Sequence, residues 1–171
     1  MVAVTVATTL ACNGRSRDGY TPSYPGARRV DVSAMKFDDG DTFVVGKEDI
    51  RLLGVDTPET MHPKVGIHEN QPFGPETSES TRVWIERAEL VEIVKDGRGR
   101  YGRRLAHIFL DGELLGERLL AAGLAYETVS HFGDSGFPDL ADRLLDAAAA
   151  GPKPRFQAPY KWRSKHQKRG R

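Results

Sequence analysis

Carboxylates flank two short apolar runs in the stretch DGDTFVVGKEDIRLLGVDTPE. Asp39 and Asp41 precede the first run, and Asp56 and Glu59 follow the second, which also contains Arg51. Neighbouring carboxylates repel each other unless a cation lies between them, and hard divalent ions such as Ca²⁺ and Mg²⁺ prefer oxygen ligands. The pattern therefore indicates a cation site, although ordinary turns and caps use the same Asp-Gly pairs.

These apolar runs read as the two strands of a hairpin, because only a short turn-like link separates them. With the turn centred on the Lys-Glu pair of that link, Val44 is expected to face Arg51. Asp41 then lies within a residue or two of Asp56 across the hairpin. Two carboxylates that are far apart in the sequence are therefore expected to be neighbours at its open end.

Two arginines are expected close to these carboxylates. Arg51 alternates with Ile50 and Leu52, so its side chain should lie on the opposite face of the strand from them. Arg103 stands at the start of another expected strand. Paired guanidinium donors suit the oxygens of a phosphodiester, and Glu59 could orient or deprotonate an attacking water. These residue types together indicate phosphodiester chemistry.

The elements that position these residues are expected in the order three strands, a helix, two strands and two helices. Proline predicts helix starts near Pro75 and at Pro138, and leucines at helical spacing predict a helix that includes 114–120. The expected strands are 29–37, 42–46, 49–55, 89–94 and 103–110. Five short strands with a helix between the third and the fourth predict an α+β fold, a five-stranded OB-type Greek-key β-barrel with three α-helices.

Charge is distributed unevenly along the 171 residues. The net charge is only +1, yet the segment 151–171 holds 8 Lys or Arg and no acid, which leaves 17 basic against 24 acidic side chains in the other 150 residues. We expect an N-terminal segment at 1–28, an OB-fold domain at 29–150 and a basic C-terminal extension at 151–171. Such an extension either adds affinity for polyanions or is a solvated end.

The N-terminal segment 1–28 combines an apolar start with a flexible linker. Its first eleven residues are too short to span a bilayer, so no transmembrane segment is expected. The chain has one cysteine, which excludes an intrachain disulfide, and TLAC ending at Cys12 is similar to a degenerate bacterial lipobox. We expect a secreted or cell-envelope-associated protein with a lipid anchor at Cys12; the alternative is a frayed N-terminus on a cytoplasmic protein.

Five blocks of the sequence occur in the order and spacing of one known family. They are DGDTFVV, IRLLGVDTPET, FGPETSEST, RYGRRLAHIFLDG and LLAAGLAYE. With them, the chain resembles the thermonuclease, or staphylococcal-nuclease-like, family. The resemblance implies an OB barrel with three helices and Ca²⁺-dependent endonuclease cleavage of DNA and/or RNA, on the 5′-oxygen side, leaving 3′-phosphate ends. The sequence leaves the oligomeric state open, and a monomer is the default expectation.

The resemblance assigns a cation site to the acidic residues. Asp41 and Asp56 match the carboxylate ligands, and Thr57 matches the residue whose carbonyl is a further ligand. Asp39 matches a residue that holds a metal-bound water. The family points to Ca²⁺, and Mg²⁺ and Mn²⁺ are the alternatives.

The resemblance also assigns the residues that act on the substrate. Arg51 and Arg103 match two phosphate-binding arginines, and Glu59 matches the proposed general base. Arg100 and Tyr101 match positions that contact the nucleotide. Because related domains also serve as weakly active or inactive nucleic-acid-binding scaffolds, that function is the alternative.

Two regions depart from the family pattern. The segment after Ala125 lacks the paired tyrosines of the nucleotide pocket, and Val129 and His131 are the candidates to replace them. In the C-terminal extension, Tyr160 and Trp162 alternate with basic residues. These aromatic side chains either stack on single-stranded substrate or pack on the barrel, and we expect mixed packing with weak binding.

Overall fold

The computed structural model of the chain describes residues 20–167. Cys12 and the lipobox-like sequence lie outside the described residues, so the lipid anchor stays a prediction. Within 20–167, no helix has both the length and the apolar character needed to cross a bilayer.

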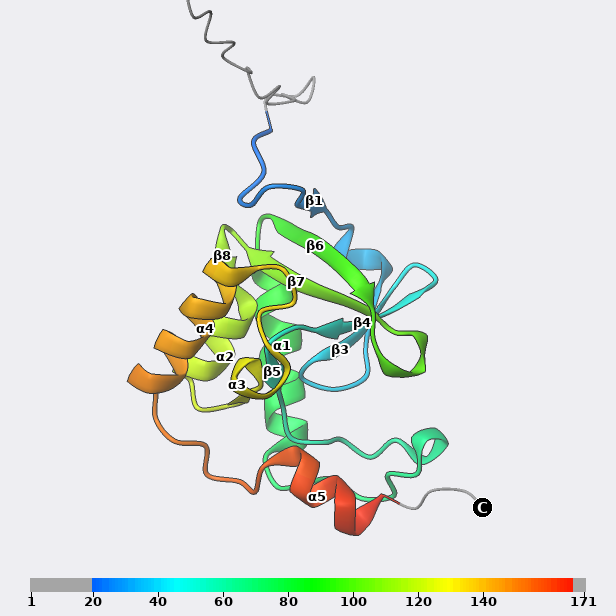
Figure 1. Cartoon of the computed structure of the whole chain (residues 1–171). Coiled ribbons are helices and arrows are strands. Elements are labelled where there is room, and N and C mark those ends of the chain that lie inside the picture. Colours follow the sequence, from blue (N-terminus) through cyan, green and yellow to red (C-terminus); the bar gives the residue numbers. More distant parts are fainter. Residues whose placement is uncertain (1–19, 168–171) are drawn as a thin grey trace, which may run out of the picture.

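A curled mixed β-sheet, with both antiparallel and parallel strand pairs, forms the centre of the structure (Figure 1). Its strand order is β1-β6-β7-β4-β3-β2, and β8 pairs with β7. The strands are β1 (Arg28–Arg29), β2 (Met35–Phe37), β3 (Thr42–Val45), β4 (Glu48–Leu52), β6 (Val91–Arg98), β7 (Arg104–Leu110) and β8 (Glu113–Leu114). A parallel β4–β7 pair joins the β2–β3–β4 meander to the antiparallel β6–β7 pair. The expected α+β class with an OB-type barrel is confirmed.

Helices and short 3₁₀ turns surround this sheet. The helices are α1 (Gly74–Arg87), α2 (Leu115–Ala121), α3 (Val129–Phe132), α4 (Pro138–Ala150) and α5 (Pro159–His166). The turns are η1 (Val32–Ala34), η2 (Pro63–Val65) and η3 (Arg100–Gly102). The three expected helices are α1, α2 and α4, and two of them carry proline in the first turn. Helices α3 and α5 were not predicted.

Three of the expected strands are wrong in their extent. The strand at 89–94 is β6, which continues to Arg98. The strand at 29–37 is interrupted by η1, because the Asp31 carboxylate caps this turn by accepting a 3.0 Å hydrogen bond from the backbone N–H of Ser33. The strand at 49–55 ends at Leu52, before Gly54 with its φ of +76°. The chain then forms a separate two-stranded sheet of β5 (Val55–Asp56) and β9 (Tyr126–Glu127).

The predicted hairpin forms, but its expected register is wrong by two residues. Arg51 pairs with Thr42 rather than with Val44. The turn consists of Gly46 and Lys47, and Gly46 supplies the positive φ of +63° that a two-residue hairpin turn favours. Because the slip is an even number of residues, every side chain keeps its expected face. The functional residues are therefore on the expected side of the sheet.

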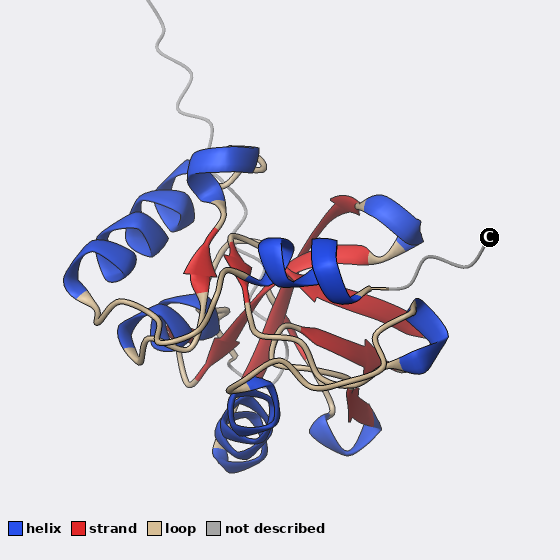
Figure 2. Ribbon diagram, turned by 90° about the horizontal axis from the view of Figure 1, so that it is seen from below, coloured by secondary structure: helices blue, strands red, loops and turns tan. Residues whose placement is uncertain are grey.

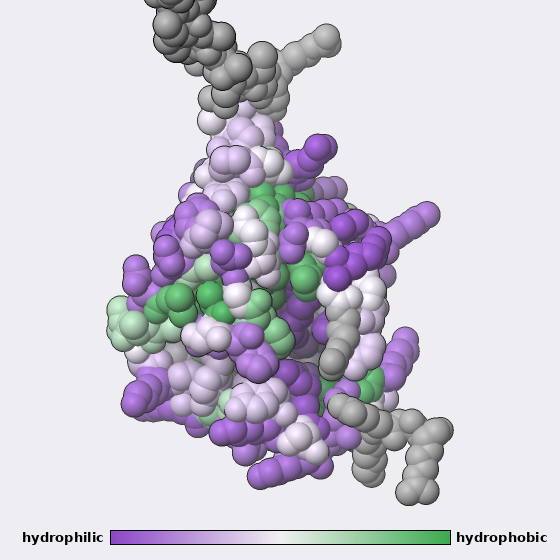
Figure 3. All heavy atoms as spheres, in the orientation of Figure 1, coloured by the Kyte–Doolittle hydropathy of each residue, from purple (hydrophilic) through white to green (hydrophobic). Residues whose placement is uncertain are grey.

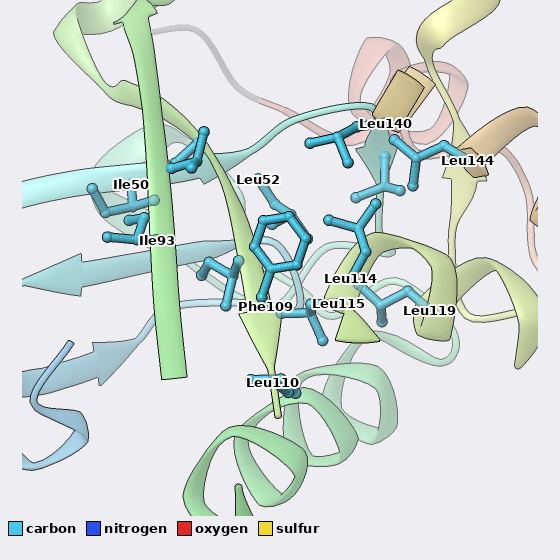
Figure 4. Close-up of a cluster of buried hydrophobic side chains, with 14 of the residues drawn as sticks. Ile50, Leu52, Ile93, Phe109, Leu110, Leu114, Leu115, Leu119, Leu140 and Leu144 are labelled. Carbon is cyan, nitrogen blue, oxygen red and sulfur yellow. The ribbon is translucent and has the colours of Figure 1, made fainter. Parts of the chain in front are cut away.

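The hydrophobic core fills the space between the curled sheet and the helices α2 and α4 (Figure 4). Ile50 and Phe109 come from the strands and are fully buried, as are Leu119 and Leu144 from the helices. Burying a side chain of this size stabilises the fold by about 1.5–3 kcal/mol. Gly54 lies so close to Leu144 that any Cβ there would collide with it. The bend after β4 is therefore held against α4.

The C-terminal extension packs on the loop between β5 and α1 instead of extending into solvent. Helix α5 lies below this loop in Figure 1 and in front of the strands in Figure 2. The Gln71 side-chain amide donates to the carbonyl of Gln157 at 2.5 Å, and the Tyr126 hydroxyl donates to the carbonyl of Phe156 at 2.8 Å. The Trp162 side chain is buried.

His107 on β7 supplies a pH-dependent part of the stability. Its ring is buried and meets the Phe137 ring edge-on, with centroids 5.1 Å apart. Burial lowers its pKa to about 4 from an ordinary value of 6.5. Since the unfolded chain binds the proton more readily, the stability that the neutral ring contributes is complete above pH 6.5 and falls between pH 6.5 and pH 4.

We expect the His107→Phe variant to lose this dependence, because phenylalanine fills the site without binding a proton. Urea unfolding at pH 7 and pH 5 measures it. The wild type should lose about 2 kcal/mol more than the variant between these two pH values. Parallel losses in both proteins would contradict the assignment of this titration to His107.

Candidate active site

Three buried carboxylates gather where β3 begins and β5 ends. Asp41, Asp56 and Glu59 are 0%, 5% and 6% exposed. One Asp41 oxygen accepts a hydrogen bond from the backbone N–H of Thr57 at 2.7 Å, and the Asp39 carboxylate accepts one from the backbone N–H of Asp41 at 3.0 Å. The structure therefore brings together the carboxylates that the hairpin predicted to be neighbours.

Arg51 lies between two of these carboxylates. Its guanidinium forms ion pairs with Asp41 and with Asp56, the second at 2.6 Å. Ile50 and Leu52 on either side of it are buried in the core, so the expected alternation of side chains holds. Burial alone would lower the pKa of Arg51, but the neighbouring carboxylates raise it above its ordinary value. The arginine is thus charged and fixed in place.

The cluster carries more negative charge than Arg51 neutralises. Burial raises the pKa of Asp41 well above its usual range, although Arg51 acts to lower it and Asp39 and Asp56 raise it further. Burial likewise raises the pKa of Glu59. These shifts mean that ionised carboxylates here are costly, and that added positive charge would stabilise them.

The loop between β5 and α1 holds Glu59 through its backbone. The N–H of Glu59 donates to the side chain of Gln71 at 3.2 Å, and the N–H of Gln71 donates to the carbonyl of Glu59 at 2.9 Å. Gly74 packs against the same carbonyl so closely that a Cβ would collide with it. Sequence reasoning missed both residues, although Gly74 lies within the quoted block FGPETSEST and Gln71 stands two residues before it.

Arg163 from α5 is a second arginine in the cluster, and it was missed from the sequence. Its guanidinium donates to both oxygens of Asp56, at 3.0 and 2.9 Å, and to Glu59. The available signal was the excess of carboxylates over arginines in the expected site. The sequence predicts mixed packing and weak polyanion binding for this segment, and it assigns no site residue there.

Arg103 lies near the cluster without a carboxylate partner. It is half-buried just before β7, and no residue within 20–167 forms an ion pair with it. Burial and then the charge of Arg51 lower its pKa, while Asp41, Asp39 and Glu59 act in the opposite direction. Its donors are therefore close to the carboxylates and still available for an anion.

The remaining expected contact residues occupy different positions. Tyr101 is 83% exposed and has a φ of +65° in η3, so its ring is free to meet a ligand. The side chain of Arg100 is not among those that the structure describes. Val129 lies in the hydrophobic core, so the expectation that it lines a nucleotide pocket is wrong. His131 is exposed and lies beside Phe132.

The donor chemistry of this cluster fits a hard divalent cation. Asp41 and Asp56 offer only carboxylate oxygens, and the buried hydroxyl of Thr57 has no hydrogen-bond partner within the described chain. In the same residues, no three His, Cys, Asp or Glu side chains form a group that could hold a metal ion. Asp41 and Asp56 are therefore the two carboxylates that the site offers to a cation, and the ligand role of the Thr57 carbonyl stays a prediction.

Hydrophilic residues surround this region on the surface. In the space-filling view, they gather around a hollow between the barrel and α5 (Figure 3). An extended polar ligand could thus enter this hollow. The arrangement could hold a phosphate between guanidinium groups, with carboxylates beside it for a cation and a water.

Comparisons with known proteins support a family assignment. A family model described as "Staphylococcal nuclease homologue" matches residues 49–149. The "Thermonuclease" of Staphylococcus hyicus is 39% identical over 92 residues, which is 51% of this chain and 53% of that protein. "Endonuclease YncB" of Bacillus subtilis (strain 168) is 40% identical over 102 residues, 56% of this chain and 47% of that protein. The chain spans about half the length of these curated relatives.

Arg51 should be a large contributor to stability, because its removal leaves two carboxylates buried together. We expect Arg51→Met to lower the free energy of unfolding by about 3–5 kcal/mol at pH 7. Arg82→Met is the matched control, since Arg82 also pairs with two carboxylates, Glu79 and Glu86, but on an exposed face of α1.

Denaturant unfolding of both variants measures the difference. The Arg82 variant should lose less than about 1 kcal/mol. Equal losses of unfolding free energy in the two variants would show that burial does not increase the contribution of the Arg51 ion pairs to stability.

Proposed function

Because the chain belongs to the staphylococcal nuclease homologue family, we propose that it is a nuclease that hydrolyses phosphodiester bonds of DNA and/or RNA. The observation that carries the proposal is the convergence of Asp41, Asp56 and Glu59 around Arg51, with the uncommitted Arg103 close by. A fixed guanidinium and a free one beside buried carboxylates suit a substrate that carries negative charge and must be attacked by water.

Each arginine has a distinct role in this proposal. Arg51 is held by Asp41 and Asp56, so it presents its remaining donors to a phosphate in a fixed direction. Arg103 binds the same phosphate from the β7 side. Together they stabilise the charge that develops on the phosphate oxygens during attack. Tyr101 and Arg100 contact the adjoining nucleotide.

Glu59 is the proposed general base. Its backbone is fixed by Gln71 and its carboxylate is buried, so it can take a proton from a water in a defined position. The oxygen of that water forms the new bond to phosphorus, the bond from phosphorus to the 5′-oxygen breaks, and the leaving oxygen takes up a proton from solvent. The products end in 3′-phosphate and 5′-hydroxyl.

Asp41 and Asp56, with the carbonyl of Thr57, would hold a divalent cation, for which Ca²⁺ is our first choice over Mg²⁺ and Mn²⁺. Such an ion supplies Lewis-acid stabilisation of the phosphate charge. Asp39 supports the site by fixing the backbone of Asp41. We further propose a monomer, exported to the cell envelope or secreted, with Cys12 as its lipid anchor.

A weakly active or inactive nucleic-acid-binding scaffold is the second candidate function. The observation that favours it is Arg163, which engages both Asp56 and Glu59. A site whose carboxylates were permanently bound by that arginine would bind nucleic acid without cleaving it.

Digestion of supercoiled plasmid and of single-stranded DNA and RNA distinguishes the two functions. We expect cleavage with Ca²⁺, abolition by EGTA, and 3′-phosphate ends in an end-group analysis. Binding without cleavage in Ca²⁺, Mg²⁺ and Mn²⁺ would reject the nuclease and favour the scaffold.

The roles of the arginines predict a separation between activity and stability. Arg51→Lys and Arg103→Lys should each lower the cleavage rate by about 10²–10³-fold, because lysine cannot supply the paired donors. Arg103→Lys should leave the melting temperature unchanged, since Arg103 has no ion-pair partner in the described chain. Arg82→Lys serves as the control that keeps full activity. Near-normal rates in both site variants would remove these arginines from the reaction.

A further inference from the structure

The contacts of Arg163 fall on two residues to which the proposed function gives essential roles. Both oxygens of Asp56 accept hydrogen bonds from its guanidinium, and one oxygen of Glu59 accepts another. Asp56 is the proposed cation ligand and Glu59 the proposed base. Because Arg163 is positively charged and contacts both carboxylates, it changes the net charge of the site.

Helix α5 holds this guanidinium in place, because the helix itself is packed against the rest of the protein. Trp162, next to Arg163, is 5% exposed, and its ring stacks on His166 with centroids 4.4 Å apart. Gln167 at the end of α5 donates to the carbonyl of Val65 at 2.8 Å, and Gln71 holds Gln157 before the helix begins. The same loop thus carries Glu59 and anchors α5, so the arginine is a built part of the site.

The hydrogen bonds to Asp56 leave little room for a cation. One of its oxygens already accepts from Arg51 at 2.6 Å and from Arg163 at 3.0 Å. A carboxylate oxygen has two lone pairs, so this oxygen is saturated. The other oxygen also accepts from Arg163, at 2.9 Å. A divalent cation on Asp56 would need a lone pair and would repel the nearby guanidinium.

We infer that Arg163 competes with the divalent cation for Asp56 and Glu59, so that helix α5 sets the cation concentration at which the site fills. The inference rests on the proposed function, because it takes Asp56 as a cation ligand. It adds a residue from outside the matched segment 49–149 to the site. A cation that binds Asp56 must either share its second oxygen with this guanidinium or displace it, and the free energy of that repulsion or displacement is subtracted from its binding.

Direct measurement of cation binding tests this competition without relying on turnover. Calcium is titrated into the full chain by isothermal calorimetry, for the wild type and for R163Q, R163K and K165Q. Lys165 is the matched control, because it is an exposed cation on the same helix. Circular dichroism and the thermal midpoint establish that each variant is folded.

We expect R163Q to bind Ca²⁺ about 10-fold more tightly than the wild type, a coupling of the usual size between sites. K165Q should stay within about 2-fold of the wild type, since screening weakens the influence of an exposed charge. R163K keeps the charge but lacks the paired donors, so its affinity should lie between those of the wild type and R163Q. It also preserves the test if R163Q does not fold.

The outcomes separate this inference from the proposed function. If the wild type binds Ca²⁺ and cleaves DNA but neither Arg163 variant binds more tightly, the competition is wrong and the nuclease assignment stands. An equal gain in K165Q also overturns it, because the effect would then be one of net charge. If no variant binds a divalent cation and none cleaves, both the competition and the proposed function are wrong.

Discussion

Buried negative charge is the constraint on which the rest of this structure depends. Asp41, Asp56 and Glu59 lie almost without solvent contact at one end of the barrel, where an ionised carboxylate is stable only beside positive charge. Arg51 on β4 and Arg163 on α5 supply that positive charge. The charge balance of the site therefore links the barrel to the C-terminal end of the described chain.

The fold accounts for how these charges stay close without collapsing into the core. The bend at Gly54 separates β4 from β5 and places Asp56 on a short second sheet with Tyr126. The leucines of α2 and α4 belong to the hydrophobic core next to this bend. The loop that carries Glu59 is then fixed from both directions, by Gln71 within it and by α5 outside it. Rigid support of this kind holds groups in place for a reaction.

Local sequence patterns predicted much of the fold. They did not predict the contacts between residues that are far apart in the sequence. Alternation and turn residues predicted the hairpin and the face of Arg51, and prolines predicted the starts of α1 and α4. The hairpin register was missed because either of two adjacent residue pairs could form the turn, and only Gly46 adopts the positive φ. Helix α5 buries only Pro159 and Trp162, so it has little apolar periodicity. No local pattern could indicate that Arg163 meets Asp56 across 107 positions.

The central claim is that these carboxylates and guanidinium groups share one cation and one phosphate. A crystal structure with Ca²⁺ and a nucleoside 3′,5′-bisphosphate tests it most directly. The account predicts an ion bound by Asp41 and Asp56, a phosphate on Arg51 and Arg103, and Arg163 withdrawn from at least one oxygen of Asp56. Electron density with neither ion nor phosphate there, while both ligands are present at saturating concentration, would contradict it.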